Sequence, residues 1–153
     1  MEGCFTGKYE EVTMISKELI ESIKLGEGFS STVYNCTSNR ATIGYGRCVD
    51  EAVGGGISEE EAEMLLMNDI QYFAEAAERV VGRVAWSWIN QRQRDALTEM
   101  AYNMGEGNLK KFKNMIAAIE ALDMDRAAEE ALDSRWAQQV GQRAHRLADK
   151  LRG

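Results

Sequence analysis

The sequence is poor in several residue types on which common catalytic sites depend. Its 153 residues include no proline, a single histidine, His145, and three cysteines at irregular spacing. Zinc sites are built from cysteine and histidine clusters, and a Ser-His-Asp triad needs a histidine beside its serine. The sequence therefore predicts neither a metal site nor such a triad, and we expect no cofactor.

Long apolar runs are absent as well. The first 14 residues, MEGCFTGKYEEVTM, alternate charged with scattered apolar side chains and contain no apolar run of signal-peptide length. No later segment approaches the ~20 consecutive apolar residues that span a bilayer. We therefore expect synthesis in a reducing cytoplasm and no stable insertion into a membrane.

Positive charge is in the minority. The chain carries 25 acidic and 18 basic residues, which gives a net charge of −7. Surfaces that bind nucleic acid or anionic lipid are normally basic, so this balance argues against both partners. A chain of 153 residues has the size of one domain, and such a domain buries roughly 70% of its unfolded surface. We expect one soluble domain that acts as a monomer.

Helical patterns dominate the chain, with one interruption near the N-terminus. Ser16 is a suitable N-cap, and Leu19, Ile20 and Ile23 follow it at helical spacing. Residues 29–53 are rich in serine, threonine, asparagine, glycine and β-branched side chains. This composition is typical of a small sheet of two or three strands, with turns at TSNR and GYG.

The rest of the chain is predicted to be helical. Ser58 and Glu61 form a capping box, and apolar residues then repeat on a helical period over about six turns. Trp86, Trp88 and Trp136 could stack on sugars, but their helical spacing favours the core. Further helices are expected in NQRQRDALTEMAYNMG, NLKKFKNMIAAIEAL, MDRAAEEAL and SRWAQQVGQRAHRLADKL.

Glu27 is the candidate for acid catalysis. It is the only carboxylate between Gly26 and Arg47, and it stands between an apolar helix and a polar hairpin whose inward residues would include Cys36 and Thr42. Partial shielding from water favours the protonated form of a carboxylic acid, which a general acid needs near neutral pH. The alternative for any single glutamate is a solvated surface carboxylate.

The spacing of these residues resembles a known catalytic signature. Eight residues separate Glu27 from Cys36, and five separate Cys36 from Thr42, which precedes IGYG. The arrangement is similar to the Glu, Asp-or-Cys, Thr signature of phage-type lysozymes, the endolysins of glycoside hydrolase family 24. Other segments resemble the same family in order, over about residues 16–150: GEGFSSTVYNC, ISEEEAEMLLMND, QRQRDALTEMAYNMGEGNLKKF and SRWAQQVGQRAHR.

The resemblance implies a mostly helical α+β fold of the lysozyme type. A small sheet-bearing lobe and a helical lobe would be joined by a long helix, with a glycan groove between them. Within one domain, residues 16–57 would form the small lobe with the catalytic stretch, residues 58–80 the connecting helix and residues 81–153 the helical lobe. Residues 1–15, which include Cys4, have no counterpart in the family and stay unassigned.

The resemblance also implies an activity. It is that of a muramidase, which hydrolyses the β-1,4 bond between N-acetylmuramic acid and N-acetylglucosamine in peptidoglycan. Glu27 would be the general acid, while Cys36 and Thr42 would hold the attacking water on the opposite face of the sugar, an inverting arrangement.

Three further residues are carried over from the family as substrate-binding. Asn103 would lie near the groove wall, Asn114 would touch the glycan and Arg143 would lie near the general acid. The expected role is host-cell lysis by an endolysin that stays in the bacterial cytoplasm and reaches the cell wall in the periplasm after release.

The sequence departs from the family at two positions and leaves alternatives open. Many members have aspartate where this chain has Cys36, and many have histidine where it has Arg47. A thiol with a pKa of about 8.5 is mostly neutral at pH 7. A lytic transglycosylase forming 1,6-anhydromuramic products, which needs one carboxylate, therefore remains an alternative, as does a catalytically weak peptidoglycan-binding protein. A disulfide between Cys36 and Cys48 is a further alternative, disfavoured in a reducing compartment.

Overall fold

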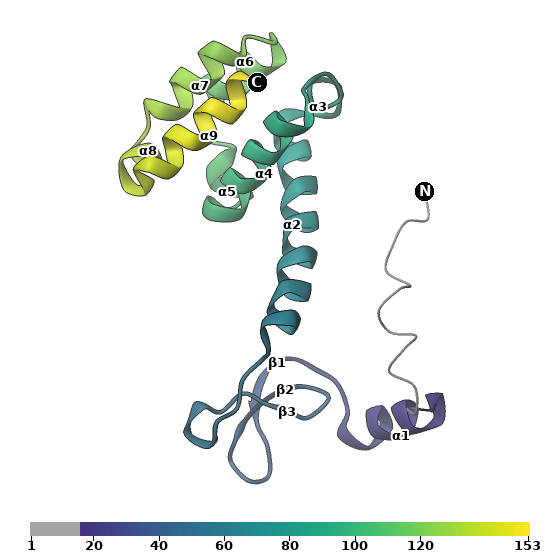
Figure 1. Ribbon diagram of the computed structural model, residues 1–153. Helices are drawn as coiled ribbons and strands as arrows, with labels where there is room; N and C mark the ends of the chain where they lie inside the picture. The colour runs from purple at the N-terminus through teal and green to yellow at the C-terminus, as the bar shows by residue number, and fades with distance from the viewer. Residues whose placement is uncertain (1–15) are drawn as a thin grey trace. The chain divides into compact units, whose positions relative to one another are not determined.

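The computed structural model describes residues 16–153, which belong to two compact units (Figure 1). The first, here called the sheet unit, ends at Glu59, and the second, the helical unit, comprises Glu60–Gly153. Residues 1–15, including Cys4, lie outside the described residues. None of the described helices is long and apolar enough to cross a bilayer.

The sheet unit begins with the helix α1, Lys17–Glu27. Ser16 is its N-cap, as predicted, and the side-chain oxygen of Ser16 accepts a hydrogen bond of 3.1 Å from the backbone N–H of Leu19. This bond satisfies one of the amides that the first turn of any helix leaves unpaired. Because the helix ends at Glu27, the candidate acid is carried on its last turn.

Three short strands follow and form an antiparallel sheet in the order β1-β2-β3. The predicted turns TSNR and GYG connect β1 to β2 and β2 to β3, and a short 3₁₀ helix that the sequence did not suggest, η1, follows the sheet. In the register of the sheet, Thr42 of the central strand lies opposite Tyr34 on one side and Cys48 on the other. The bounds are Ser30–Asn35 for β1, Ala41–Gly44 for β2, Arg47–Cys48 for β3 and Glu51–Val53 for η1.

The helical unit consists of α2 and the shorter helices that follow it. A helix is predicted over 58–80 and is observed as α2. The segments predicted as helices after it are largely helical, but a turn at 110–112 separates α5 from α6, and Gly141 separates α8 from α9, where the sequence suggested continuous helices. The bounds are Glu59–Val81 for α2, Arg83–Trp88 for α3, Gln91–Met104 for α4, Glu106–Leu109 for α5, Lys113–Glu120 for α6, Met124–Leu132 for α7, Arg135–Val140 for α8 and Gln142–Arg152 for α9.

Polar caps set where several of these helices begin. Asn90 and Gln93 form a complete capping box at α4, since each side chain accepts a hydrogen bond from the other residue's backbone N–H. The side-chain amide of Gln93 also donates to the carbonyl of Leu151 at 3.0 Å, which ties α4 to the end of α9. Asp123 and Ser134 are the N-caps of α7 and α8, and their side-chain oxygens accept hydrogen bonds from the backbone N–H groups of Arg126 and Ala137.

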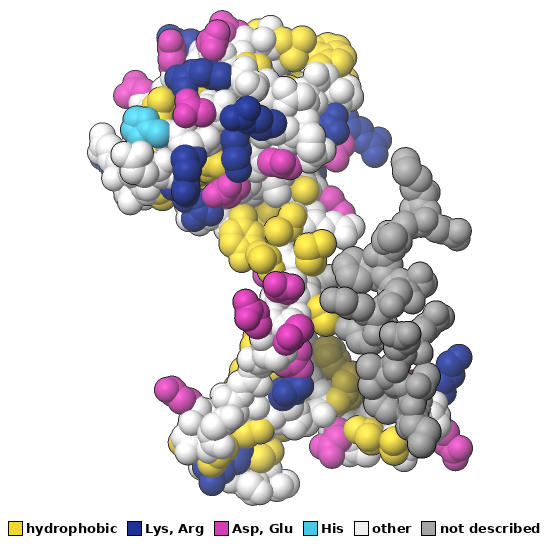
Figure 2. All heavy atoms as spheres, in the orientation of Figure 1, with side chains coloured by type: hydrophobic (Ala, Val, Ile, Leu, Met, Phe, Trp, Pro, Cys, Tyr) yellow, Lys and Arg dark blue, Asp and Glu magenta, His cyan; other side chains and the backbone are white. Residues whose placement is uncertain are grey.

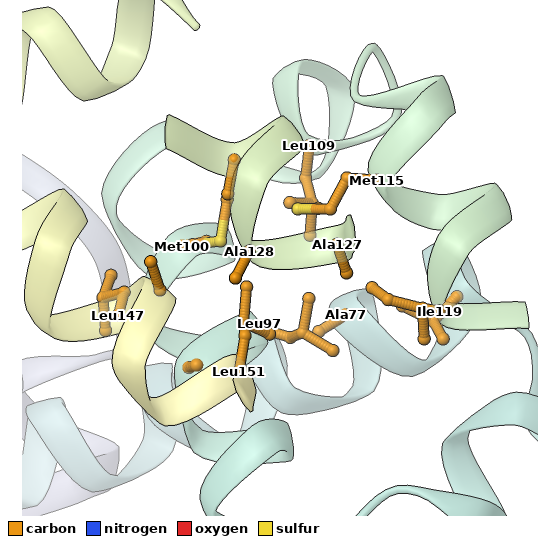
Figure 3. Packing of buried hydrophobic residues seen from close by; sticks show 14 of the residues in the cluster. Ala77, Leu97, Met100, Leu109, Met115, Ile119, Ala127, Ala128, Leu147 and Leu151 are labelled. Carbon is orange, nitrogen blue, oxygen red and sulfur yellow. The ribbon is translucent and has the colours of Figure 1, made fainter. Parts of the chain in front are cut away.

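The core lies within the helical unit, where buried side chains of α4, α6, α7 and α9 meet (Figure 3). Leu97, Met100 and Leu151 are fully buried, and several alanines fill the space between neighbouring helices. Alanine lets helix backbones approach closely, while leucine and methionine supply most of the apolar area removed from water. The alanines of this core include Ala77, Ala96, Ala101, Ala127, Ala128, Ala131, Ala144 and Ala148.

An ion-pair cluster holds α5 against α2. Arg79 donates to the Glu106 carboxylate at 2.9 Å, and Lys110 lies 2.8 Å from its other oxygen. The hydrogen bond from Arg79, reinforced by Lys110, lowers the pKa of Glu106 to about 2. The carboxylate is therefore ionised over the physiological pH range.

The three tryptophans differ from one another in burial. Trp136 is 8% exposed and belongs to the core, as predicted, and Trp86 is half-buried and packs against it. Trp88 is 59% exposed, so the prediction of a core position is wrong for this residue. It is the last residue of the short helix α3, where helical spacing says little about which face is covered.

Candidate active site

The side chain of Glu27 lies against the turn between β2 and β3. A β-carbon added to Gly46 would be 2.8 Å from Glu27 Oε2 and 3.2 Å from Cδ, so the carboxylate rests on the backbone of Gly46. Tyr45 of the same turn holds the end of α1 from another side: its ring centroid lies 5.4 Å from that of Phe29 and 5.8 Å from Lys24 Nζ. The end of α1 is thus attached to the sheet at Tyr45 and at Gly46.

Glu27 is nevertheless an exposed residue. The predicted shielding of its carboxylate by the polar hairpin is therefore wrong within the sheet unit. The physical reason is the small size of the turn: two of its three residues, Gly44 and Gly46, have no side chain with which to cover a carboxylate.

Cys36 and Thr42 are brought together by the β1–β2 hairpin. The backbone N–H of Cys36 donates to the carbonyl of Arg40 at 3.0 Å, and the hydroxyl of Thr42 donates to the same carbonyl at 2.9 Å. Thr42 is only 3% exposed, whereas Cys36 is half-buried. The sulfur is therefore the more accessible of these two predicted site groups.

Hydrogen bonds lower the pKa of the Cys36 thiol. The largest contribution comes from the backbone of Arg40, followed by the backbone of Ser38 and the side chain of Thr42, while desolvation opposes them. All three bonds stabilise a negative charge on the sulfur. A hydroxyl has one proton, so Thr42 can donate to the Arg40 carbonyl or to the sulfur, and it can turn to the sulfur when the thiol ionises.

A disulfide between Cys36 and Cys48 has no support in the structure. Both are free thiols. Cys36 follows β1 and Cys48 is in β3, on opposite sides of the central strand. Strands two places apart in a sheet are separated by about 9 to 10 Å, which exceeds the ~4.4 to 6.8 Å between Cα atoms that a disulfide requires.

Asn103 has a structural partner in the helical unit. Its side-chain oxygen accepts a hydrogen bond of 2.7 Å from the indole N–H of Trp136. Because Trp136 is buried, this bond satisfies a donor that would otherwise lose its contact with water. Asn103 itself is exposed, so its amide nitrogen can still meet a ligand.

Asn114 lines a hollow of about 690 Å³ in the surface of the helical unit. Its side-chain amide donates to Glu130 at 3.2 Å. The hollow is mixed in character, since Phe112 and Trp136 supply apolar surface while Lys111 and Glu130 supply opposite charges. Aromatic faces beside hydrogen-bonding groups are the lining that a sugar can use, because a sugar ring has an apolar face and a rim of hydroxyls.

Arg143 is paired with an acidic residue that the sequence did not single out. Its Nε donates to Glu99 at 2.9 Å, and Lys150 lies 3.4 Å from the other oxygen of Glu99. Arg143 and Glu99 are each 32% exposed, so the pair is accessible from solvent. The structure therefore places Arg143 in a three-residue charge cluster of the helical unit.

Acidic and basic side chains are mixed on the surface of the helical unit (Figure 2). Among the described residues, no group of three or more His, Cys, Asp or Glu side chains is arranged to hold a metal ion. On the face of the helical unit shown in Figure 2, Lys and Arg side chains alternate with Asp and Glu.

Comparison with known proteins decides the family. The model of the phage lysozyme family matches residues 24–151, which include every residue proposed for the site. The chain belongs to the phage lysozyme family. Within this lysozyme-family chain, the small three-stranded sheet followed by helices is the fold that the resemblance implied.

Individual relatives agree with this assignment. The chain is 36% identical over 121 residues to an endolysin of Bacillus phage B103, covering 77% of the chain and 44% of the relative. It is 31% identical over 91 residues to an endolysin of Acyrthosiphon pisum secondary endosymbiont phage 1, covering 60% of each. It is 30% identical over 153 residues to the pre-baseplate central spike protein of Enterobacteria phage T4, covering 84% of the chain and 26% of the relative. The chain thus spans between about a quarter and three fifths of the length of these relatives.

Sequence reasoning missed the partners of the predicted residues. Glu99 and Glu130, which bind Arg143 and Asn114, lie 44 and 16 residues away along the chain. Their positions on helices carried no signal beyond those of other surface glutamates. Gly46 stood inside the GYG turn, but nothing in the sequence indicated that Glu27 would lie on it.

Proposed function

We propose that this lysozyme-family chain is a muramidase that hydrolyses the β-1,4 bond between N-acetylmuramic acid and N-acetylglucosamine of bacterial peptidoglycan. One observation carries the proposal in addition to the family assignment. The carboxylate of Glu27 lies on the turn that directly follows β2, the strand that holds Thr42 beside Cys36. An acid at the end of α1 and a water-binding pair on the adjoining hairpin are the groups that glycoside hydrolysis needs.

Glu27 acts as the general acid. It transfers its proton to the glycosidic oxygen as the bond from that oxygen to the anomeric carbon breaks, so that the leaving sugar departs as a neutral alcohol. A water molecule attacks the anomeric carbon from the opposite face and inverts its configuration. The proton that this water loses passes to solvent or to the Cys36 thiolate.

Cys36 and Thr42 hold the attacking water. The lowered pKa of Cys36 increases the thiolate fraction near neutral pH, and a thiolate supplies a negative charge at the position where many family members have an aspartate. Such a charge also favours the positive charge that develops on the sugar ring. Thr42 is almost buried, so little of its side chain is available to contact the water. Its main role is the hydrogen bond that it donates to the Cys36 sulfur.

The helical unit supplies substrate-binding groups. We assign glycan binding to the hollow that Asn114 lines. Asn103 lies beside this hollow, because its side chain accepts a hydrogen bond from Trp136, one of the lining residues. Arg143 is exposed enough to donate to an acidic group of peptidoglycan, while Lys150 keeps its ion pair with Glu99. These contacts would lower KM without taking part in bond cleavage.

The relatives named endolysins suggest a role in host-cell lysis. We propose that the chain acts as a monomer on the cell wall after it leaves the cytoplasm. The second candidate activity, lytic transglycosylation, is favoured by Cys36, because that reaction requires one carboxylate and uses the 6-hydroxyl of the muramic acid in place of water.

Mass spectrometry of the soluble products released from purified peptidoglycan tests the proposal. Hydrolysis leaves reducing-end N-acetylmuramic acid, which is the expected product. Products lighter by one water molecule would identify the anhydro sugar and the transglycosylase. Release of no soluble product, with retention of the chain on the sacculi, would identify a binding protein. A Glu27→Gln variant digested in parallel controls for contaminating lytic enzymes.

A further inference from the structure

We propose that Gly46 is the positioning residue for the catalytic carboxylate, because the Glu27 carboxylate occupies the space that a side chain at position 46 would fill. The inference rests on the proposed function of Glu27 as the general acid. It concerns a residue that takes no part in the chemistry and to which the catalytic signature of glutamate, cysteine and threonine assigns no role.

The contact involves the whole end of the side chain. From a β-carbon built on Gly46, Glu27 Oε2 would lie at 2.8 Å, Cδ at 3.2 Å and Cγ at 3.5 Å. The first of these distances is shorter than real β-carbons tolerate, so any side chain at position 46 would displace the carboxylate. The space beside the Gly46 backbone is therefore available to Glu27 only because residue 46 is glycine.

The turn offers an internal comparison. Gly44 and Gly46 flank Tyr45, and both have positive φ, at 67° and 82°. An alanine at either position would strain the backbone for the same reason, since only glycine adopts these angles at no steric cost. The two glycines differ in their surroundings, because a β-carbon on Gly44 would meet nothing within 4 Å. Backbone strain is thus matched, and the contact with Glu27 is specific to Gly46.

The other contacts of the turn explain why displacement would matter. Tyr45 contacts Lys24 in α1 and Phe29 just after it, so the helix end is kept in place while the flexible carboxylate is the part that moves. Moving a catalytic group by about 1 Å can reduce turnover ~10²-fold. Displacing the end of the Glu27 side chain, in contrast, should lower stability little beyond the loss that backbone strain at position 46 already causes.

The test compares Gly46→Ala with Gly44→Ala in three measurements. Thermal or denaturant unfolding should show similar losses of stability for both variants. The kcat for peptidoglycan fragments should fall about tenfold to a hundredfold more in Gly46→Ala than in Gly44→Ala, with KM within about twofold of the parent. The ¹³C carboxyl resonance of Glu27, assigned by its loss in Glu27→Gln, should shift in Gly46→Ala and stay near its parent position in Gly44→Ala.

Equal losses of kcat in the two variants would overturn the proposal, as would an unshifted Glu27 resonance in Gly46→Ala. If alanine prevents folding, Gly46→Asn and Gly44→Asn give the same comparison with less strain, because asparagine tolerates positive φ. The resonance does not depend on activity. If Glu27→Gln retains full activity, the proposed function of Glu27 fails. The Glu27 resonance in Gly46→Ala still shows whether the carboxylate occupies the space beside Gly46.

Discussion

The two units of this protein are stabilised in different ways. In the sheet unit, Thr42 is the one described residue that is fully buried, and the fold depends on a capped helix, a short ladder and glycine turns. In the helical unit, buried residues from most of the helices form one apolar core. The proposed chemistry lies in the unit without a core, and the proposed glycan-binding hollow lies in the unit with one.

This difference separates activity from stability. An exposed side chain such as Glu27 contributes little burial, so replacing it should change catalysis and leave the fold intact. A side chain such as Leu97 makes no contact with solvent and belongs to the core of the helical unit, so replacing it should change stability first. Each of the following variants tests one side of this division.

The largest effect is expected from Glu27→Gln. Loss of a general acid should reduce lytic activity about 10²- to 10⁴-fold. Clearing of a cell-wall suspension measures the loss, and circular dichroism with thermal unfolding checks that the variant folds like the parent. A folded Gln variant with activity within threefold of the parent would show that Glu27 is not the acid.

Leu97→Ala tests the core of the helical unit. Truncating a fully buried leucine should lower the free energy of unfolding by about 2 to 5 kcal/mol, because the lost transfer energy adds to that of the cavity left behind. The control is Val33→Ala in the sheet unit, where Val33 is 58% exposed and a change of at most about 0.5 kcal/mol is expected. Urea denaturation measures both, and similar losses would contradict the division between the units.

Asn103→Ala separates structure from substrate binding within the helical unit. It leaves the buried indole N–H of Trp136 without its acceptor, which should lower the free energy of unfolding by about 1 to 3 kcal/mol. Asn103→Asp is the matched variant, since it keeps an oxygen for the indole and removes the amide nitrogen. If only the nitrogen contacts the glycan, Asn103→Asp should raise KM with little loss of stability. A stable Asn103→Ala variant would contradict the structural part of this prediction.

The smallest effect is expected from Cys36→Asp. A carboxylate accepts hydrogen bonds from water at least as well as the Cys36 sulfur and carries a negative charge that favours the positive charge on the sugar, so activity should stay within a few-fold of the parent. Cys36→Ser should keep part of the activity, because a hydroxyl is still an acceptor but ionises less readily than a thiol. Thr42→Ala should lose most of the activity. Kinetics on soluble peptidoglycan fragments rank the three variants.

A parallel assay with and without reductant tests the role of the thiol. We expect no difference and a constant number of free thiols, since Cys36 and Cys48 lie on opposite sides of β2. Activity that changes as these two cysteines pair would contradict the water-holding role and favour redox control.

Much of the fold could be predicted from the sequence because its signals are local. Ser16 predicted the start of α1, the change of composition after residue 29 predicted the sheet, and Ser58 preceded α2. The prediction for Trp88 was wrong because periodicity in a helix of six residues cannot tell which face is covered. The shielding expected for Glu27 was wrong because it depended on side chains that a Gly-Tyr-Gly turn does not have.

The sequence by itself determined that a short helix and a small sheet precede a series of helices, the family, and which residues are the catalytic candidates, since each depends on residue types at fixed spacing along the chain. Only the tertiary structure decided which groups face one another. It placed Glu27 on Gly46, joined Cys36 and Thr42 at the carbonyl of Arg40, and paired Arg143 with Glu99. Such contacts depend on the register of strands and the packing of helices, which join residues distant in sequence through distances and angles that spacing along the chain does not specify.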